Sequence, residues 1–220
     1  MSKPAAIEFF FDPISPFAWL ASTRLDEISQ HTGREILIRP TLFAGLLKAH
    51  GNLGPAEIPA KREYIFRDAM RRANTLGINV ECPPQHPFNP LLALRVCTAF
   101  NKNSDRLRLT PALCNAAWRD GLDITKPESV HNVVNSCGLD ADHALSMAQD
   151  PAVKQALIDT TNIAVERGIF GVPTFYLDGQ IFWGEDRIGE LLSFAEGGQQ
   201  IDEAKLQEVL AREAAVQRKR

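Results

Sequence analysis

Ser15 lies in the stretch FDPISPFAW (residues 11–19), where an apolar run gives way to a segment of helical spacing. Serine is a favoured N-cap residue and proline suits the first helical position, so Ser15-Pro16 predicts a helix start. The free N–H groups and the dipole of a helix start favour an anion, to which a serine hydroxyl can donate a hydrogen bond. A thiolate is one such anion, and a simple helix cap is the alternative interpretation. No G-x-S-x-G and no neighbouring general base accompany Ser15, which argues against a hydrolase nucleophile.

A second motif, GVPT (residues 171–174), precedes a predicted strand. Pro173 can simply start this strand. Alternatively, a cis Val172–Pro173 bond would leave the backbone of Val172 facing outward, where it could pair with an extended peptide ligand. About one X-Pro bond in twenty is cis, so the residues alone leave both interpretations open.

A third motif, Trp183-Gly184-Glu185-Asp186, stands where a strand is predicted to end and a helix to begin. Acidic side chains are favourable in the first turn of a helix, so Glu185 and Asp186 can serve as capping residues. They can equally receive the ammonium group of a ligand. The Trp183 side chain would then cover the site, or it would only pack beside it.

The four cysteines, Cys82, Cys97, Cys114 and Cys137, are scattered and form no C-x-x-C. This spacing contains neither a dithiol redox motif nor a zinc-ligand cluster, so we predict buried free thiols and no metal site.

The elements that must position the three motifs form two β-containing halves on either side of a helical block. The predicted elements of the halves are strands over 5–11 and 35–41, helices over 16–33, 151–167, 186–195 and 202–217, and a hairpin at Asp178-Gly179. Each half is too small to cover a sheet alone, which predicts an α/β fold with one four-stranded mixed sheet and an inserted all-helical domain. The predicted boundaries are 1–45 and 151–220 for the halves and 46–150 for the insertion.

Composition is that of an ordinary globular protein: 220 residues, 45% hydrophobic, with a formal net charge of −3. Disordered and fibrous classes are excluded, and the charge gives no reason to expect nucleic acid or a membrane surface as a partner. The basic end at residues 218–220 is too short to change this. The N-terminus does not have the pattern of a signal peptide, and no apolar run is long enough to span a bilayer, so we expect a cytoplasmic protein.

The three motifs, in this order and with a helical insertion between the β halves, resemble the 2-hydroxychromene-2-carboxylate isomerase family. The shared patterns are F-D-x-x-S-P-x-x-W, G-V-P-T and W-G-x-D-R, and the resemblance extends over roughly residues 5–195. This family is related to kappa-class glutathione transferases and to the thiol oxidases typified by disulfide-bond formation protein A. The resemblance implies a thioredoxin-like fold.

The resemblance also implies glutathione as the cofactor. Ser15 takes the place of the reactive first cysteine of thiol oxidoreductases, and Ala18 stands three residues further, so dithiol exchange is unavailable. As the catalytic residue, Ser15 would donate a hydrogen bond to the glutathione sulfur and lower the pKa of its thiol. The implied glutathione-binding residues are Ser15, Val172, Pro173, Trp183, Gly184, Glu185 and Asp186. Among them, Pro173 would be a cis-proline, the Val172 backbone would pair with the cysteinyl part, and residues 183–186 would contact the γ-glutamyl end. Glu185 stands where some relatives have asparagine.

A second pocket, between the thiol site and the insertion, is implied for a small aromatic hydroxy-keto acid. The implied substrate-binding residues are Lys48, Asn52, Ala56, Glu57, Phe88 and Asn89. The substrate carboxylate needs a cation or an amide, for which Lys48, Arg62 and Asn89 are candidates. Lys48 and Arg62 can equally be solvated helix charges.

The implied activity is the interconversion of 2-hydroxychromene-2-carboxylate and trans-o-hydroxybenzylidenepyruvate, a step of aromatic degradation. A thiolate adds reversibly to the open-chain enone, so that the former double bond can rotate. A kappa-like transferase that releases glutathione conjugates and a non-catalytic thioredoxin-fold binding protein are the alternatives. The relatives also imply a homodimer.

Overall fold

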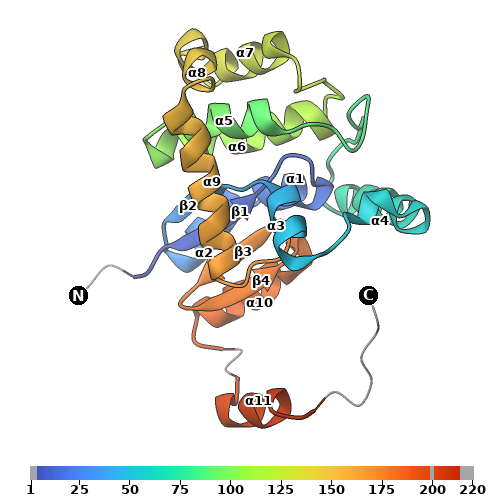
Figure 1. Cartoon of the computed structure of the whole chain (residues 1–220), viewed down its shortest axis with the longest axis vertical. Coiled ribbons are helices and arrows are strands. Elements are labelled where there is room, and N and C mark those ends of the chain that lie inside the picture. The colour runs from blue at the N-terminus through green and yellow to red at the C-terminus, as the bar shows by residue number, and fades with distance from the viewer. Residues whose placement is uncertain (1–3, 199–200, 214–220) are drawn as a thin grey trace.

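Four short strands form one mixed sheet in the order β2-β1-β3-β4 at the centre of the molecule (Figure 1). The structure, a computed structural model, describes residues 4–198 and 201–213. The strands are β1 (Ile7–Phe11), β2 (Ile36–Pro40), β3 (Thr174–Leu177) and β4 (Gln180–Trp183). β1 and β2 run parallel, whereas the β1–β3 and β3–β4 pairs are antiparallel.

Helices cover both faces of this sheet and build the insertion. Their bounds are α1 (Pro16–Ser22), α2 (Leu25–Thr32), α3 (Phe43–His50), α4 (Pro59–Thr75), α5 (Leu91–Ala99), α6 (Asn103–Trp118), α7 (Pro127–Ser136), α8 (Ala141–Met147), α9 (Pro151–Glu166), α10 (Ile188–Ala195) and α11 (Glu203–Leu210), with 3-10 turns η1 (Pro55–Glu57) and η2 (Glu185–Arg187). In Figure 1, α5 to α8 lie above the sheet, α4 projects to one side, and α11 lies apart below it.

The alternation of side chains along β1 divides the core into two parts. Phe9 and Phe11 point to the face covered by α1, α2 and α10, and the Phe9 ring packs on Phe175 of β3 with centroids 4.9 Å apart. Phe10 points to the opposite face and packs with Leu46 of α3 and with Ala164 of α9. Burial on both faces explains why residues 9–11 form an unbroken apolar run instead of an alternating one.

The insertion shares the larger of these two cores with the sheet. Trp118 at the end of α6 stacks against Trp19 of α1, with ring centroids 6.3 Å apart, and both are buried. Asn103, the first residue of α6, binds the outer edge of β2 through its side chain: Oδ1 accepts from Ile38 N at 2.9 Å and Nδ2 donates to Ile36 O at 2.7 Å. The predicted α/β fold with an inserted helical part is therefore confirmed.

The predicted helix over residues 16–33 is interrupted, and this prediction was wrong in detail. α1 ends at Ser22 and α2 begins at Leu25. The hydroxyls of Ser22 and Thr23 donate to the carbonyls of Trp19 and Leu20, both at 2.7 Å. Such side-chain hydrogen bonds compete with the helical pattern at this point.

The remaining elements follow the prediction closely. α9 ends before Gly168, whose φ of +76° allows the chain to turn. Asp178 and Gly179 join β3 and β4 with positive φ at both positions, the geometry of a tight hairpin turn. The predicted boundary at residue 45 falls within α3 and stays a prediction. The last helix is observed over residues 203–210, and its predicted end at Gln217 and the basic terminus lie outside the described residues.

Candidate active site

Ser15 caps α1, as its sequence neighbours predict. Its backbone is extended, with φ −90° and ψ 122°, and its Oγ accepts a hydrogen bond from Ala18 N at 3.2 Å. Pro16 occupies the first turn, where a missing N–H costs nothing. The hydroxyl oxygen is therefore fixed at the start of the helix.

The Ser15 hydroxyl also reaches the segment before β3. Its Oγ donates to the carbonyl oxygen of Val172 at 3.3 Å, a contact between residues 157 positions apart. The Val172–Pro173 peptide bond is cis, as the family resemblance implied. The fold thus brings together two of the three motifs, the serine of one and the backbone edge of the other.

Two side chains of the helical block bind the loop that leads to Ser15. Trp118 Nε1 donates to Pro13 O at 2.9 Å, and His86 Nε2 donates to Ile14 O at 3.0 Å. The His86 and Trp118 rings meet at a centroid distance of 5.3 Å. Burial, the largest cause, lowers the pKa of His86, which keeps the ring neutral at neutral pH. Sequence reasoning missed Trp118, because nothing local connects it with a loop about a hundred residues earlier.

The Asp12 carboxyl group also fixes the loop that leads to Ser15. Its side chain is fully buried, and its two oxygens accept from Ile14 N at 3.0 Å and from Phe43 N at 2.9 Å. Burial raises the pKa of Asp12 to about 7, and the two backbone hydrogen bonds oppose this shift. The loop before Ser15 is consequently joined to the start of α3 by a carboxyl group that is poised between its two protonation states.

Gly184 of the third motif lies directly beside Pro173, and Asp186 follows two residues later. Gly184 N donates to Pro173 O at 2.9 Å, which joins the end of β4 to the cis-proline segment. Gly184 has φ +113°, and a Cβ there would collide with Oδ1 of Asp186. The Asp186 carboxylate is about half exposed and has Arg187 Nη2 as a partner at 3.0 Å, so it is accessible to a ligand cation.

Glu185 requires a correction, because its carboxylate is not directed to a ligand. It is only 2% exposed and is bound by Arg24 Nη1 at 3.1 Å and by the guanidinium of Arg72. A buried carboxylate satisfied by two arginines has no reason to leave them for an ammonium group. Sequence reasoning had no signal for this cluster, since its three members are far apart in the chain.

Trp183 lies over Gly171, where a Cβ would collide with the indole. The indole meets the Phe170 ring edge to face, with centroids 4.9 Å apart, and remains 52% exposed. Trp183 is thus an exposed side chain beside the residues that precede Val172. The indole packs against Phe170 and Gly171, and a covering role over a ligand stays a prediction.

The residues expected to bind a second substrate fall into two groups. Lys48, Asn52, Ala56 and Glu57 follow one another from the last turn of α3 to η1; Lys48 and Asn52 are exposed. The carboxylate of Glu57 accepts from Gly54 N at 2.6 Å and so stabilises its own turn. Arg62 links this side to the second group, since its Nη2 donates to His86 O at 3.2 Å.

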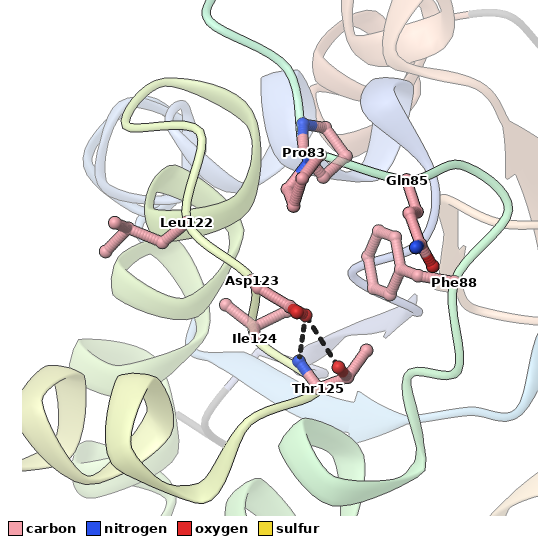
Figure 2. A pocket seen from close by; sticks show the side chains of 8 residues that line it. Pro83, Gln85, Phe88, Leu122, Asp123, Ile124 and Thr125 are labelled. Atoms are coloured by element: carbon pink, nitrogen blue, oxygen red, sulfur yellow. Dashed lines mark hydrogen bonds between the residues drawn. The ribbon is translucent and has the colours of Figure 1, made fainter.

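Phe88 and Asn89 form the second group, and both have local structural partners. Asn89 Oδ1 accepts from Leu91 N at 3.0 Å at the start of α5. Figure 2 shows Phe88 and Gln85 across a small cavity from Ile124 and Thr125. The cavity measures about 10 Å³, which is room for a water molecule and not for an aromatic acid. A binding role for these two residues stays a prediction.

The protein's own thiols are poorly suited to the chemistry of the site. All four cysteines are free, and Cys97 and Cys114 are buried. Burial raises the pKa of Cys97 to about 11 and raises that of Cys114 as well. Residues 4–198 and 201–213 contain no group of three or more His, Cys, Asp or Glu side chains arranged to hold a metal ion. None of the helices in these ranges has the length and hydropathy of a membrane span.

Comparison with known proteins gives a consistent set of relatives. The DSBA-like thioredoxin domain family matches residues 6–195. The chain is similar to "2-hydroxychromene-2-carboxylate isomerase" of Sphingobium xenophagum, with 31% identity over 86% of this chain and 96% of the relative. It is also similar to human "Glutathione S-transferase kappa 1", with 29% identity over 88% of this chain and 92% of the relative.

A solved structure of 2-hydroxychromene-2-carboxylate isomerase superimposes with a TM-score of 0.81. It covers 94% of this chain and all of its own, at 26% sequence identity. The similarity therefore extends over the sheet, the insertion and the three motifs together.

Proposed function

The chain belongs to the DSBA-like thioredoxin domain family, and from this membership we propose that it is a glutathione-dependent isomerase. The proposed reaction interconverts 2-hydroxychromene-2-carboxylate and trans-o-hydroxybenzylidenepyruvate. Its relatives at about 30% identity include isomerases with this name and kappa glutathione transferases, which supports glutathione chemistry.

The observation that carries the proposal is the placement of Ser15. Its Oγ lies at the start of α1 and 3.3 Å from the Val172 carbonyl, next to a cis-proline. Position 18 is alanine, and the described cysteines are held elsewhere, so the protein offers a thiol-binding geometry without a thiol. A cofactor that brings its own thiol fits this arrangement.

The residues present also fit the rest of glutathione. Val172 provides a backbone edge for the cysteinyl part, with Pro173 beside it. Asp186 provides an accessible carboxylate for the ammonium group of the γ-glutamyl end. Gly184 leaves the space that the Asp186 side chain occupies.

Glutathione, when bound, supplies the nucleophile that adds reversibly to the enone and is returned unchanged. Ser15 donates a hydrogen bond to the sulfur and so favours the thiolate. The N–H groups at the start of α1 add a positive potential at the same point. Side chains between α3 and α5 would orient the carboxylate of the second substrate, and Lys48, Arg62 and Asn89 are the candidates for this contact.

The test is product analysis with purified protein, glutathione and 2-hydroxychromene-2-carboxylate. We expect the open-chain isomer to form while total glutathione stays constant. Ser15→Ala should lose nearly all turnover and about 1 kcal/mol of stability through the lost cap, whereas exposed Ser146→Ala should change neither. Full turnover in Ser15→Ala would contradict the assigned role.

A kappa-like transferase is the second candidate, because relatives of that class match at nearly the same identity. It requires the same thiolate, and it differs in releasing a thioether. Stoichiometric loss of glutathione with an electrophile would establish this activity in place of isomerisation. If calorimetry detects no glutathione binding at millimolar concentration, both enzyme proposals fall and the chain is a binding protein.

We also propose a cytoplasmic homodimer. The dimer follows from the family resemblance, and four scattered cysteines without a C-x-x-C are compatible with a reducing compartment. Light scattering of the purified protein tests whether it is a dimer.

A further inference from the structure

Ser15 is the last residue of a tight turn that begins at Asp12. Ser15 N donates to Asp12 O at 3.1 Å and closes the turn, and Ile14 N donates to the Asp12 side chain at 3.0 Å. In a turn of this kind, the carbonyls of the two central residues take no part in the closing hydrogen bond. Pro13 O and Ile14 O therefore need partners from elsewhere in the fold.

The insertion supplies both partners. Trp118 Nε1 donates to Pro13 O at 2.9 Å, and His86 Nε2 donates to Ile14 O at 3.0 Å. Ile14 O and Ser15 N belong to one planar peptide unit, so a hydrogen bond that orients this carbonyl also orients the backbone of Ser15. Of the two side chains, His86 therefore acts on the peptide bond of Ser15 itself.

The polar atoms of the His86 ring have one partner in the described part of the chain. A carbonyl only accepts, so Nε2 carries the proton, and in the neutral ring Nδ1 carries none. Nδ1 is buried and has no hydrogen-bond partner among residues 4–198 and 201–213.

The surroundings of the ring are aromatic. The rings of Phe66, Phe88 and Trp118 lie around the imidazole, with centroids 5.3 to 6.4 Å from its own. A phenyl group would suit such surroundings without burying an unpaired nitrogen, so packing alone does not explain a histidine here. What the imidazole adds is the N–H that Ile14 O receives.

Arg62 of α4 fixes the backbone of the same histidine. Its Nη2 donates to His86 O at 3.2 Å, and its guanidinium lies over the Phe66 ring, 5.5 Å from the centroid. Phe66 in turn meets the imidazole edge to face. His86 is therefore held from α4 at its carbonyl and at its ring, while its N–H is directed at the turn before Ser15.

We propose that His86 is a positioning residue for Ser15, and that its hydrogen bond to Ile14 O sets the direction in which the Ser15 hydroxyl meets the sulfur of a bound thiol. This inference rests on the proposed use of glutathione. The hydroxyl and the N–H groups at the start of α1 favour a thiolate only where they point at the sulfur. Without the hydrogen bond to Ile14 O, the turn spreads these groups over several orientations, and less of the bound thiol is ionised.

The experiment compares His86→Gln with His86→Met. The two side chains have nearly the same length and neither is charged, but only glutamine has an N–H that can replace Nε2. For His86→Met, the thiolate fraction of bound glutathione at neutral pH, measured by ultraviolet absorbance, should fall about fivefold, the effect of one hydrogen bond. The kcat for isomerisation should fall by a similar factor, while the KM for glutathione changes less than about twofold. His86→Gln should recover most of both losses.

Asn103→Ala separates positioning from stability. Asn103 binds Ile36 and Ile38 at the edge of β2, so this variant should lower the stability of the fold and leave the thiolate fraction and kcat unchanged. Urea unfolding of all variants gives the stabilities for this comparison. If His86→Met does not fold, His86→Phe takes its place, because phenylalanine suits the surrounding rings and also lacks the N–H.

Two results overturn the role of His86 while glutathione still binds. One is that the variant without the N–H equals either His86→Gln or the wild type in thiolate fraction and kcat. The other is that Asn103→Ala loses as much as this variant does, since lower stability would then explain the loss. Absence of glutathione binding to the wild type at millimolar concentration means instead that the proposed function fails.

Discussion

At Gly184, one backbone angle decides where a neighbouring carboxylate lies. A φ of +113° is accessible to glycine and rare for other residues, and the missing side chain leaves room for Oδ1 of Asp186. The sequence shows this glycine only as part of a motif. The structure shows why glycine is needed here: a side chain at this position would occupy the space of the Asp186 carboxylate.

We predict that Gly184→Ala displaces the Asp186 carboxylate and weakens glutathione binding about tenfold, the cost of one charged hydrogen bond. Stability should fall by about 1–2 kcal/mol, because alanine is strained at this φ. Calorimetry and chemical unfolding measure the two effects.

Gly189→Ala is the control for this variant. Gly189 lies within α10 and has open space around its α-carbon, so alanine should bind glutathione normally and stabilise the helix by up to about 1 kcal/mol. Normal glutathione affinity in Gly184→Ala would show that the Asp186 position is not set by this glycine.

Asp12 predicts a pH dependence of stability. Burial raises its pKa from 3.8 in the ordinary case to about 7, so the folded state binds a proton that the unfolded state releases between these values. The contribution of Asp12 to the free energy of unfolding is present below about pH 4 and is lost as the pH rises through about 7. The loss is on the order of 1–4 kcal/mol.

The measurement is urea unfolding of the wild type and of Asp12→Asn at several pH values. The difference between the two curves should change across this window and be flat above pH 8. Asp26→Asn, at an exposed position of α2, should run parallel to the wild type. A constant difference for Asp12→Asn at every pH would contradict the raised pKa.

The structural features of the candidate site were predictable wherever they depend on local sequence, and the roles of these residues toward a ligand stay predictions. Ser15 with Pro16, the cis-proline motif and Asp186 are short patterns, and the structure brings them to one place. Glu185 was assigned wrongly, because its partners Arg24 and Arg72 come from other elements. Long-range pairs of single charges leave no pattern in one sequence.

At the scale of elements, α6 of the insertion also binds the open edge of the sheet. β2 is an edge strand, and an edge leaves N–H and C=O groups unpaired. The amide side chain of Asn103 meets one group of each kind, at Ile38 and at Ile36. The Asn103 side chain thus provides the hydrogen bonds that a neighbouring strand would otherwise provide to β2.

We predict that Asn103→Ala destabilises the fold by about 1–3 kcal/mol, because it removes both hydrogen bonds and leaves two backbone groups of β2 without a partner. Asn101→Ala, at an exposed position two residues earlier, should cost less than about 0.5 kcal/mol. Thermal unfolding checks both, and equal values for the two variants would disprove the role of Asn103.

The order of elements was predictable, and their ends were less so. Alternating apolar and polar residues were sufficient to predict strands, the D-G pair was sufficient to predict the hairpin, and the proline at position 151 was sufficient to predict the start of α9. The break between α1 and α2 depends on hydroxyls that bond backward, and serine and threonine also occur within helices. The residue types alone therefore do not distinguish a serine or threonine that ends a helix from one that lies within it.

At the scale of the molecule, the inserted helices and the sheet share one core. Trp19 and Trp118 stack across their junction, and the loop before Ser15 receives hydrogen bonds from both Trp118 and His86. The sequence predicts an inserted helical domain over residues 46–150, and these boundaries stay a prediction. The packing adds that the loop before Ser15 is held between the insertion and the sheet.

We predict a single cooperative unfolding transition, since neither part can lose its structure without exposing the shared core. Tryptophan fluorescence and far-ultraviolet circular dichroism should report the same midpoint. Two separated midpoints would show that the insertion unfolds by itself. The isolated segment 46–150 should accordingly fail to fold.

The hydrogen bond from Ser15 to the Val172 carbonyl has a thermodynamic consequence. A ligand sulfur that accepts a hydrogen bond from Ser15 Oγ replaces the existing hydrogen bond to the Val172 carbonyl. No hydrogen bond is gained, so the thiol contributes little net affinity. An analogue of glutathione with a methyl group in place of the thiol should therefore bind almost as well as glutathione does. The tripeptide's ends would govern affinity, and the serine would govern only which protonation state of the sulfur is held. Occupancy and reactivity are thus set by different residues and can be tuned independently.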